Sequence, residues 1–352
     1  MNRTILFFVS AGSQIGLGHL MRCLSIAHAL RGEGISCFFV VETEYVHQVV
    51  KEQGFLCYQL KQSITNGDGI ESELPVLVYL IKSLEPMTVI VDSYQVTKTY
   101  LATLMGHTRV VYMDDVCAFP YPCDVLVNYN IYAPKWKVLY RQSYQGKCPS
   151  LILGPTYAPL REDFQNLPPR ESRLDVRHVL LSTGGSDPEN IAQKLLSLVQ
   201  KTPDWEHIQF HIVIGSMNPN KSELVHMAQM IPNVQIHVAI KDMAHLMQMC
   251  DMAVAAAGST LYELCACGTP TVTYILADNQ IPGAQEFERQ GLMLNAGDCR
   301  QSDFMLHLFE KMMTLLTSVK MRRMMSAQMQ RTVDGFGAKR LAQELLKNIS
   351  KP

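Results

Sequence analysis

The residues best placed to do chemistry lie in Gly16-Leu17-Gly18-His19-Leu20-Met21-Arg22, where a short apolar strand should give way to a helix. Gly16 and Gly18 allow a tight turn and a close approach to a ligand, and the helix points free amide groups at the same space. The positive helix end opposes protonation and Arg22 acts the same way, so His19 should be neutral and basic near pH 7. A surface histidine beside an ordinary turn is the alternative.

Gly258-Ser259-Thr260-Leu261-Tyr262-Glu263 is the better of two candidate phosphate sites. It joins an expected strand to a helix start, and Ser259 and Thr260 add two hydroxyl donors to the free amides. Glu263 falls in the first helical turn, where a carboxylate could hold the vicinal hydroxyls of a ribose. A capping arrangement of Ser or Thr with Glu explains the same residues and is compatible with a ligand site.

Thr183-Gly184-Gly185-Ser186-Asp187 is the weaker phosphate candidate. Its backbone amides could cradle a phosphate, but it is neither a Walker loop nor the GxGxxG pattern. A Gly184-Gly185 turn with Asp187 as a helix cap explains it equally well.

Polar side chains follow three other expected strands. Asn279 and Gln280 could hold sugar hydroxyls or an N-acetyl group, or could belong to a plain polar loop. Asp92-Ser93-Tyr94 brings a phenol to the same sheet edge as His19. Asp114 and Asp115 could bind Mg²⁺, but no third carboxylate accompanies them, so a hydrogen-bonded structural pair is favoured.

The elements that position these residues alternate between short apolar strands and helices, a pattern typical of parallel sheets covered on both faces. In the first half, strands are expected at 4–9, 35–41, 88–91, 109–112 and 125–127, and a helix at 20–30. A proline-rich stretch at 154–173 marks a boundary, after which strands are expected at 176–182, 208–214, 234–238, 251–256 and 271–275. Helices are expected at 191–199, 223–230 and 261–266, and from residue 302 onward.

The composition is that of a globular protein with sizeable cores, since 47% of its 352 residues are hydrophobic and 18% are charged. A net charge of −1 gives no general nucleic-acid surface. No apolar run approaches the roughly 20 residues needed to cross a bilayer. The ten cysteines show no CxxC spacing and are expected to be reduced thiols in the cytoplasm.

Nine motifs together resemble one family, in order and in approximate spacing. The motifs are Gly16-x-Gly18-His19-x2-Arg22, Asp92-Ser93-Tyr94, Met113-Asp114-Asp115, Cys123-Asp124-x3-Asn128, Leu153-Gly154-Pro155-x-Tyr157, Leu160-Arg161, Gly184-Gly185-x-Asp187, Gly258-Ser259-Thr260-x2-Glu263 and Asn279-Gln280. The family that they resemble is the pseudaminic acid pathway hydrolase, UDP-2,4-diacetamido-2,4,6-trideoxy-β-L-altropyranose hydrolase, of the glycosyltransferase-B superfamily.

The resemblance implies an α/β fold of two Rossmann-like domains with parallel sheets facing a central cleft. The first domain, residues 1–165, would carry the catalytic base, and residues 166–352 would bind UDP and include the C-terminal helices. His19 would be a base on water that attacks the anomeric carbon with inversion, assisted by Tyr94. No metal or redox cofactor is implied.

The resemblance also assigns the substrate contacts. The diphosphate would lie at 258–260, the ribose at Glu263, the uracil beside residues 241–244 with Met243, and the sugar at Asn279. Substrate binding is further expected at Gly16, Gly18, Arg22, Gly184, Gly185, Asp187 and Gln280. We expect a monomer that binds a small-molecule UDP-sugar, without nucleic-acid or membrane partners.

Three alternatives remain open at this stage. A glycosyltransferase of the same superfamily would use His19 to deprotonate an acceptor hydroxyl instead of water. A UDP-N-acetylglucosamine 2-epimerase would differ in its product. A non-catalytic nucleotide-sugar binder would leave His19, Tyr94 and Asn279 without a reason to converge.

Overall fold

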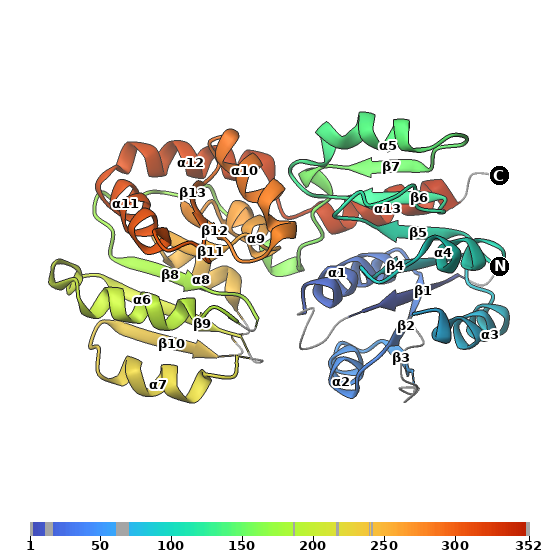
Figure 1. Cartoon of the computed structure of the whole chain (residues 1–352), viewed down its shortest axis with the longest axis horizontal. Coiled ribbons are helices and arrows are strands. Elements are labelled where there is room, and N and C mark those ends of the chain that lie inside the picture. Colours follow the sequence, from blue (N-terminus) through green and yellow to red (C-terminus); the bar gives the residue numbers. More distant parts are fainter. Residues whose placement is uncertain are drawn as a thin grey trace. The chain divides into compact units, whose positions relative to one another are not determined.

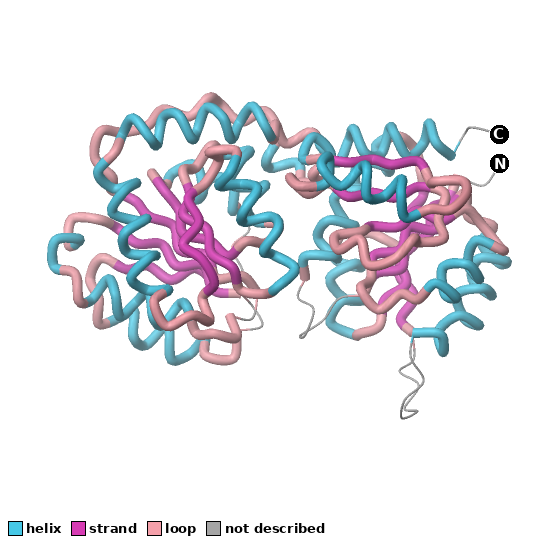
Figure 2. The backbone as a smooth tube through the Cα atoms, turned by 45° about the horizontal axis from the view of Figure 1, so that its top comes forward, coloured by secondary structure: helices cyan, strands magenta, loops and turns pink. Residues whose placement is uncertain are grey.

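The computed structural model describes residues 3–10, 17–60, 70–185, 187–215, 218–238, 240 and 242–349. The chain divides into two units, which are described separately. The first unit consists of Met1–Leu160 together with Phe336–Pro352, and the second unit consists of Arg161–Gly335. Each unit is an open, all-parallel sheet with helices packed around it (Figures 1 and 2).

The sheet of the first unit has seven strands in the order β3-β2-β1-β4-β5-β6-β7. Its central strands are almost completely buried, as expected for apolar strands covered by helices on both faces. The strands are β1 (Thr4–Val9), β2 (Ser36–Val41), β3 (Leu56–Gln59), β4 (Thr88–Asp92), β5 (Val110–Met113), β6 (Val125–Asn128) and β7 (Ser150–Leu153).

The described residues of the first unit also form six helices and three short 3₁₀ turns. The helices are α1 (Gly18–Gly32), α2 (Glu44–Glu52), α3 (Leu74–Leu84), α4 (Lys98–Met105), α5 (Lys137–Ser143) and α13 (Gly337–Ile349). The turns are η1 (Ile70–Glu73), η2 (Ala133–Trp136) and η3 (Pro155–Tyr157).

The sheet of the second unit repeats this topology with six strands in the order β10-β9-β8-β11-β12-β13. The strands are β8 (His178–Ser182), β9 (Gln209–Ile214), β10 (Val234–Val238), β11 (Met252–Ala256), β12 (Thr271–Ile275) and β13 (Leu294–Asp298). The helices are α6 (Ile191–Gln200), α7 (Lys221–Gln229), α8 (Met243–Met249), α9 (Thr260–Cys267), α10 (Ile281–Arg289), α11 (Phe304–Thr317) and α12 (Val319–Thr332). The 3₁₀ turns are η4 (Glu162–Phe164), η5 (Pro203–Trp205) and η6 (Asp278–Gln280).

In both sheets the strand order reverses beside the first strand of the unit. Ligands of open parallel sheets bind beyond the carboxyl ends of the strands at such a switch point. The expected fold class, two parallel-sheet α/β domains, is confirmed.

The last helix differs from the expected division, which assigned residues 166–352 to one C-terminal domain. Helix α13 packs against α1, β7 and η3 and lies among the blue and green elements of the first unit in Figure 1. Its buried stripe includes Leu341, Ala342 and Leu345. The amphipathic spacing predicts such a helix, but it carries no information about which sheet the apolar stripe will cover.

Among the described residues, no helix is both long enough and apolar enough to span a bilayer.

Candidate active site

The candidate base lies at the carboxyl edge of the first sheet. Leu17 is the N-cap residue of α1, Gly18 begins the helix, and His19 is its second residue. Gly16, which was expected to bind substrate, lies outside the described residues. Loops after β4, β5 and β6 bring further polar side chains to the same edge.

The His19 ring is buried, with 6% of the residue exposed, and lies between a carboxylate and a phenol. Its Nδ1 is 3.3 Å from Oδ1 of Asp92 but makes no hydrogen bond to any described group, because the two groups are not aligned for one. Its ring meets that of Tyr94 edge to face, with centroids 4.6 Å apart.

Burial lowers the pKa of His19 below its ordinary value; the charge of Asp92 raises this pKa, and the charge of Arg22 lowers it. The net direction is downward, so the imidazole is neutral at pH 7. The neutral state agrees with the expectation from the sequence. Burial is the largest cause of the lowered pKa of His19, whereas the sequence suggested the helix end and Arg22 as causes.

Arg22 has a different role from the substrate contact expected of it. Its guanidinium is fully engaged by protein groups: Nε and Nη2 donate to Oδ2 and Oδ1 of Asp92 at 2.6 and 2.5 Å. Nη1 donates to Oδ2 and Oδ1 of Asp115 at 2.9 and 3.2 Å, and to the hydroxyl of Tyr129 at 3.2 Å. Arg22 therefore ties two strand ends together beneath His19.

Asp115 holds the candidate catalytic phenol. Its Oδ2 accepts from the hydroxyl of Tyr94 at 2.7 Å, and its Oδ1 accepts from Nδ2 of Asn130 at 2.8 Å. Burial raises the pKa of Asp115, but the charge of Arg22 and the Tyr94 hydrogen bond help to bring it below its ordinary value. Asp115 is therefore an ionised carboxylate.

The neighbouring Asp114 accepts from the backbone amides of Val116 and Cys117 and from the hydroxyl of Tyr140. Hydrogen bonds thus occupy both carboxylates, as favoured over a Mg²⁺ pair. The described residues contain no group of three or more His, Cys, Asp or Glu side chains arranged to hold a metal.

The sequence assigned Asp92 no role of its own, suggested a structural pair for Asp115, and did not point to Tyr129 or Asn130. One signal was available: each follows or ends an apolar strand that pairs in parallel with the next. The carboxyl ends of such strands meet at one edge, which predicts that polar residues placed there will be neighbours.

In the second unit, the loop from Gly258 to Thr260 joins β11 to α9. Ser259 is the N-cap residue, but its side chain makes no capping hydrogen bond. The capping box considered from the sequence is therefore not formed, and the hydroxyl of the exposed Ser259 is not used to satisfy the first amides of α9. Such a helix start suits an anion.

Glu263 lies one turn into α9, and its side chain is 22% exposed. Burial raises the pKa of Glu263 to about 7, although the charge of Arg161 opposes this shift. Nη2 of Arg161 is 3.8 Å from Oε1 of Glu263. The carboxyl group therefore titrates in the physiological range.

The loop after β8 divides into a glycine turn and a helix cap. Gly184 and Gly185 are exposed, and Gly184 has a φ of +82° with open space beside its Cα. Asp187 is only 1% exposed, and its carboxylate accepts from the amides of Ile191 and Ala192 at 2.8 and 2.9 Å. Asp187 is thus a cap of α6, the alternative considered from the sequence.

Two further predicted contacts have structural roles. Met243, expected beside uracil, is 9% exposed and is part of the core beneath α8. Oε1 of Gln280 accepts from the amide of Leu276 at 2.8 Å and closes the turn after β12. Asn279 is exposed in the same turn, which Arg300 anchors through Asp278 at 2.6 Å.

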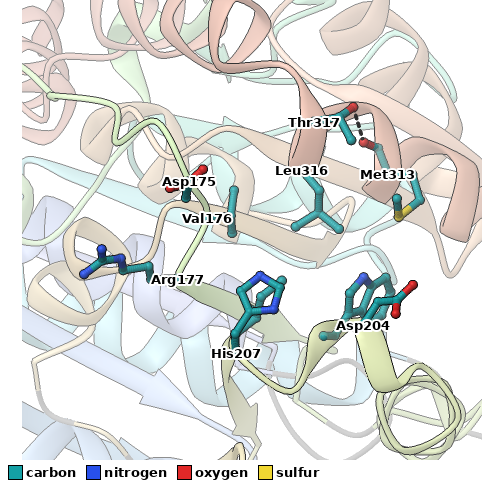
Figure 3. A pocket seen from close by; sticks show the side chains of 10 residues that line it. Asp175, Val176, Arg177, Asp204, His207, Met313, Leu316 and Thr317 are labelled. Carbon is teal, nitrogen blue, oxygen red and sulfur yellow. Dashed lines mark hydrogen bonds between the residues drawn. The ribbon is translucent and has the colours of Figure 1, made fainter.

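A pocket of about 630 Å³ lies at the opposite, amino edge of the second sheet (Figure 3). It is lined by the segments that precede β8 and β9 and by the end of α11, including Val176, Trp205 and Leu316. None of the predicted site residues lines it, so it is separate from the loops at 184–187 and 258–260.

No protein-family model matches the chain. Spore coat polysaccharide biosynthesis protein SpsG of Bacillus subtilis is 25% identical over 296 residues, which is 82% of each chain. UDP-2,4-diacetamido-2,4,6-trideoxy-beta-L-altropyranose hydrolase of Campylobacter jejuni is 25% identical over 264 residues, 74% of this chain and 86% of that protein.

Solved structures share the whole fold at low sequence identity. Acinetobacter baumannii MurG aligns with a TM-score of 0.66 at 14% identity, covering 98% of this chain and 99% of that one. LpCGTa in complex with UDP aligns with a TM-score of 0.67 at 13% identity, covering 100% of both. The chain therefore has the glycosyltransferase-B fold, and its relatives include the hydrolase family that its motifs resemble.

Proposed function

We propose that this protein is a nucleotide-sugar hydrolase that releases UDP from UDP-2,4-diacetamido-2,4,6-trideoxy-β-L-altropyranose. Water attacks the anomeric carbon, and the configuration there is inverted. The second unit holds UDP, and the first unit supplies the base. The reaction belongs to pseudaminic acid biosynthesis.

The observation that carries the proposal is the neutral, buried imidazole of His19 with Asp92 at its Nδ1. Nδ1 faces a carboxylate, so Nε2 is the nitrogen that takes the proton from water. Asp92 then stabilises the imidazolium that forms, as the third group of a nucleophile–base pair commonly does. Tyr94, in edge contact with the ring, completes the group.

The leaving group needs no acid in this mechanism. A glycosyl bond to UDP already carries a good leaving group, so positive dipoles at the diphosphate are sufficient. The first amides of α9, with the hydroxyls of Ser259 and Thr260, supply them. Glu263 accepts from the ribose hydroxyls, and Asn279 contacts the sugar.

The comparisons support the coarser part of the proposal, an enzyme that processes UDP-sugars. One relative is named as the hydrolase of this substrate, and one neighbour of the same fold was solved with UDP. The choice of water as acceptor is supported by the site geometry and by that relative.

The reaction in ¹⁸O-labelled water, followed by mass spectrometry, tests the proposal. Cleavage of the sugar C–O bond places the label on the released sugar, whereas label on the phosphate would refute the mechanism. The incubation contains purified protein and the UDP-sugar without any acceptor. A glycosyltransferase would give no turnover there, and a 2-epimerase would return a UDP-linked product.

A further inference from the structure

Three charged side chains lie together beneath His19, and their charges do not cancel. The carboxylates are Asp92 at the end of β4 and Asp115 after β5, and the single guanidinium is Arg22 on α1. The exposed fraction is 0% for Asp92, 6% for Arg22 and 9% for Asp115. While His19 is neutral, this buried group carries one net negative charge.

The two carboxylates share the guanidinium unequally. Two nitrogens of Arg22 donate hydrogen bonds to Asp92, one to each carboxylate oxygen, at 2.6 and 2.5 Å. Asp115 receives only the third nitrogen, at 2.9 and 3.2 Å, and its other side-chain contacts are the neutral donors Tyr94 and Asn130. The bidentate pair is the more fully neutralised one, so the excess negative charge resides mainly on Asp115.

We propose that Asp115 is a positioning residue for the reaction, whose uncompensated carboxylate stabilises the imidazolium of His19 as the base takes its proton. This inference rests on the proposed function and goes beyond the contact between His19 and Asp92. Asp115 does not touch the reacting atoms, and it acts through the charge of the His19 ring and through the fixed phenol of Tyr94.

The reaction needs no reactant besides water and the UDP-sugar. The oxygen of water forms the new bond to the anomeric carbon while Nε2 of His19 takes one of its protons. The bond between that carbon and the UDP oxygen breaks, and UDP leaves with the electron pair. Asp115 stays ionised throughout, so its interaction with the ring grows only as the ring becomes charged, which favours the transition state over the ground state.

In the part of the chain that the structure describes, charged groups of the first unit act on His19. Asp92 and Tyr94 come from the end of β4 and the loop after it, and Asp115 from the loop after β5. Arg22 on α1 opposes the charge of the imidazolium, and Tyr129 and Cys23 contact Arg22 and Asp92 without adding charge. Asp92 and Asp115 are thus the two groups that raise the pKa of His19 by their charge.

The test measures the pKa of His19 by NMR in the full-length protein without substrate. Asp115→Asn removes the charge but keeps the shape, and the His19 pKa should fall by about 1 unit. Asp115→Glu keeps the charge and should restore most of the original value. The matched control is Asp114→Asn, the same change in the adjacent buried carboxylate, which should leave the His19 pKa unchanged.

Kinetics provide the second readout. In Asp115→Asn the acid limb of the kcat profile should move to lower pH, and kcat at pH 7.5 should fall about tenfold while KM stays constant. If the asparagine variant unfolds, Asp115→Ser provides the same loss of charge. An unchanged His19 pKa in these variants, or an equal fall in Asp114→Asn, would overturn the inference. A wild-type protein that releases no UDP would instead overturn the proposed function.

Discussion

His19 combines two properties that a base on water requires, a neutral resting state and a nearby group that tolerates its charged state. Burial supplies the first, and Asp92 supplies the second. A freely exposed histidine would have neither, because solvent would screen the carboxylate and hold the pKa near its ordinary value. The site therefore depends on the packing around α1 as much as on the imidazole itself.

Replacing His19 by alanine should reduce kcat by about 10²–10⁴-fold, the range typical of a general base, while UDP binding is unchanged. The reason is that the UDP contacts proposed here come from α9 and its loop. Kinetics of UDP release and calorimetry with UDP measure the two quantities. An equal loss of UDP affinity and turnover would indicate a structural role for the ring.

Glu263 should make UDP binding depend on pH in the physiological range. Its pKa is raised to about 7, so its ionised fraction falls as the pH decreases through 7. If the ribose hydroxyls bind the carboxylate form, the Kd of UDP should be roughly fivefold higher at pH 6 than at pH 7. Calorimetry across this range measures it. Glu263→Gln should bind UDP more weakly at pH 8 and show no such dependence.

At this scale the sequence predicted which residues would be neighbours at the sheet edge better than it predicted the partners of each side chain. His19 and Tyr94 are in contact at a sheet edge. Four other expected contact residues make hydrogen bonds within the protein or pack in its core, because side-chain direction and hydrogen-bond partners depend on strands far away in sequence. These residues are Arg22, Asp187, Met243 and Gln280. The spacing of these residues along the sequence cannot show that Asp92 and Asp115 would accept hydrogen bonds from the guanidinium of Arg22.

At the scale of elements, three strands of the second unit carry a histidine ladder, His178 on β8, His211 on β9 and His237 on β10. Nδ1 of His178 lies 3.0 Å from Nε2 of His211, whose Nδ1 lies 3.1 Å from Nε2 of His237. Burial, followed by the neighbouring histidines, lowers the pKa of His211 to about 4. Burial and the neighbouring histidines thus oppose protonation of His211.

This ladder should make the second unit sensitive to acid. The folded-state pKa of His211 lies below the ordinary 6.5, so the stabilisation is complete above pH 6.5 and is lost as the pH falls toward 4. The loss amounts to about 3 kcal/mol. Melting temperatures between pH 7 and 4 should fall less steeply in His211→Phe than in the wild type. An exposed-site control, His307→Gln, should follow the wild type.

The alternation of apolar runs predicted most central strands within a residue or two, because a buried parallel strand is a continuous apolar segment. It missed β3, β7 and β13. The first two are edge strands of only four residues with partly exposed side chains, and β13 carries Asn295, Gly297 and Asp298. Edge strands owe their conformation to one neighbour, so their own residues carry little signal.

At the scale of the molecule, the two units differ in continuity. The second unit is one uninterrupted segment, Arg161–Gly335, whereas the first needs both Met1–Leu160 and the final helix. Gly337 begins that helix and lies against the backbone of Ala158, near the end of the first segment. A Cβ at Gly337 would lie 2.1 Å from the carbonyl oxygen of Ala158. The sequence could not show that this helix packs on the first unit, because the apolar stripe of a helix does not indicate which sheet it will cover.

The expected consequence is that residues 161–335 fold alone and bind UDP, whereas residues 1–160 alone do not reach the native state. Removing α13 exposes the surface of α1 against which it packs, and leaves the first unit without the buried Leu341 and Leu345. Circular dichroism and calorimetry with UDP test the first fragment. For the second, a peptide of residues 336–352 should restore cooperative unfolding, and native behaviour without that peptide would contradict the argument.

Because α13 is the last helix of the chain but belongs to the first unit, it also affects the order in which the two units can fold during translation. Translation proceeds from the amino terminus, and domains usually fold in that order. Here the second unit has its last residue once Gly335 is made, while the unit that bears His19 still lacks α13, which packs against α1. The segment synthesised later can therefore complete its fold first, and the packing around His19 is complete only after α13 has been made.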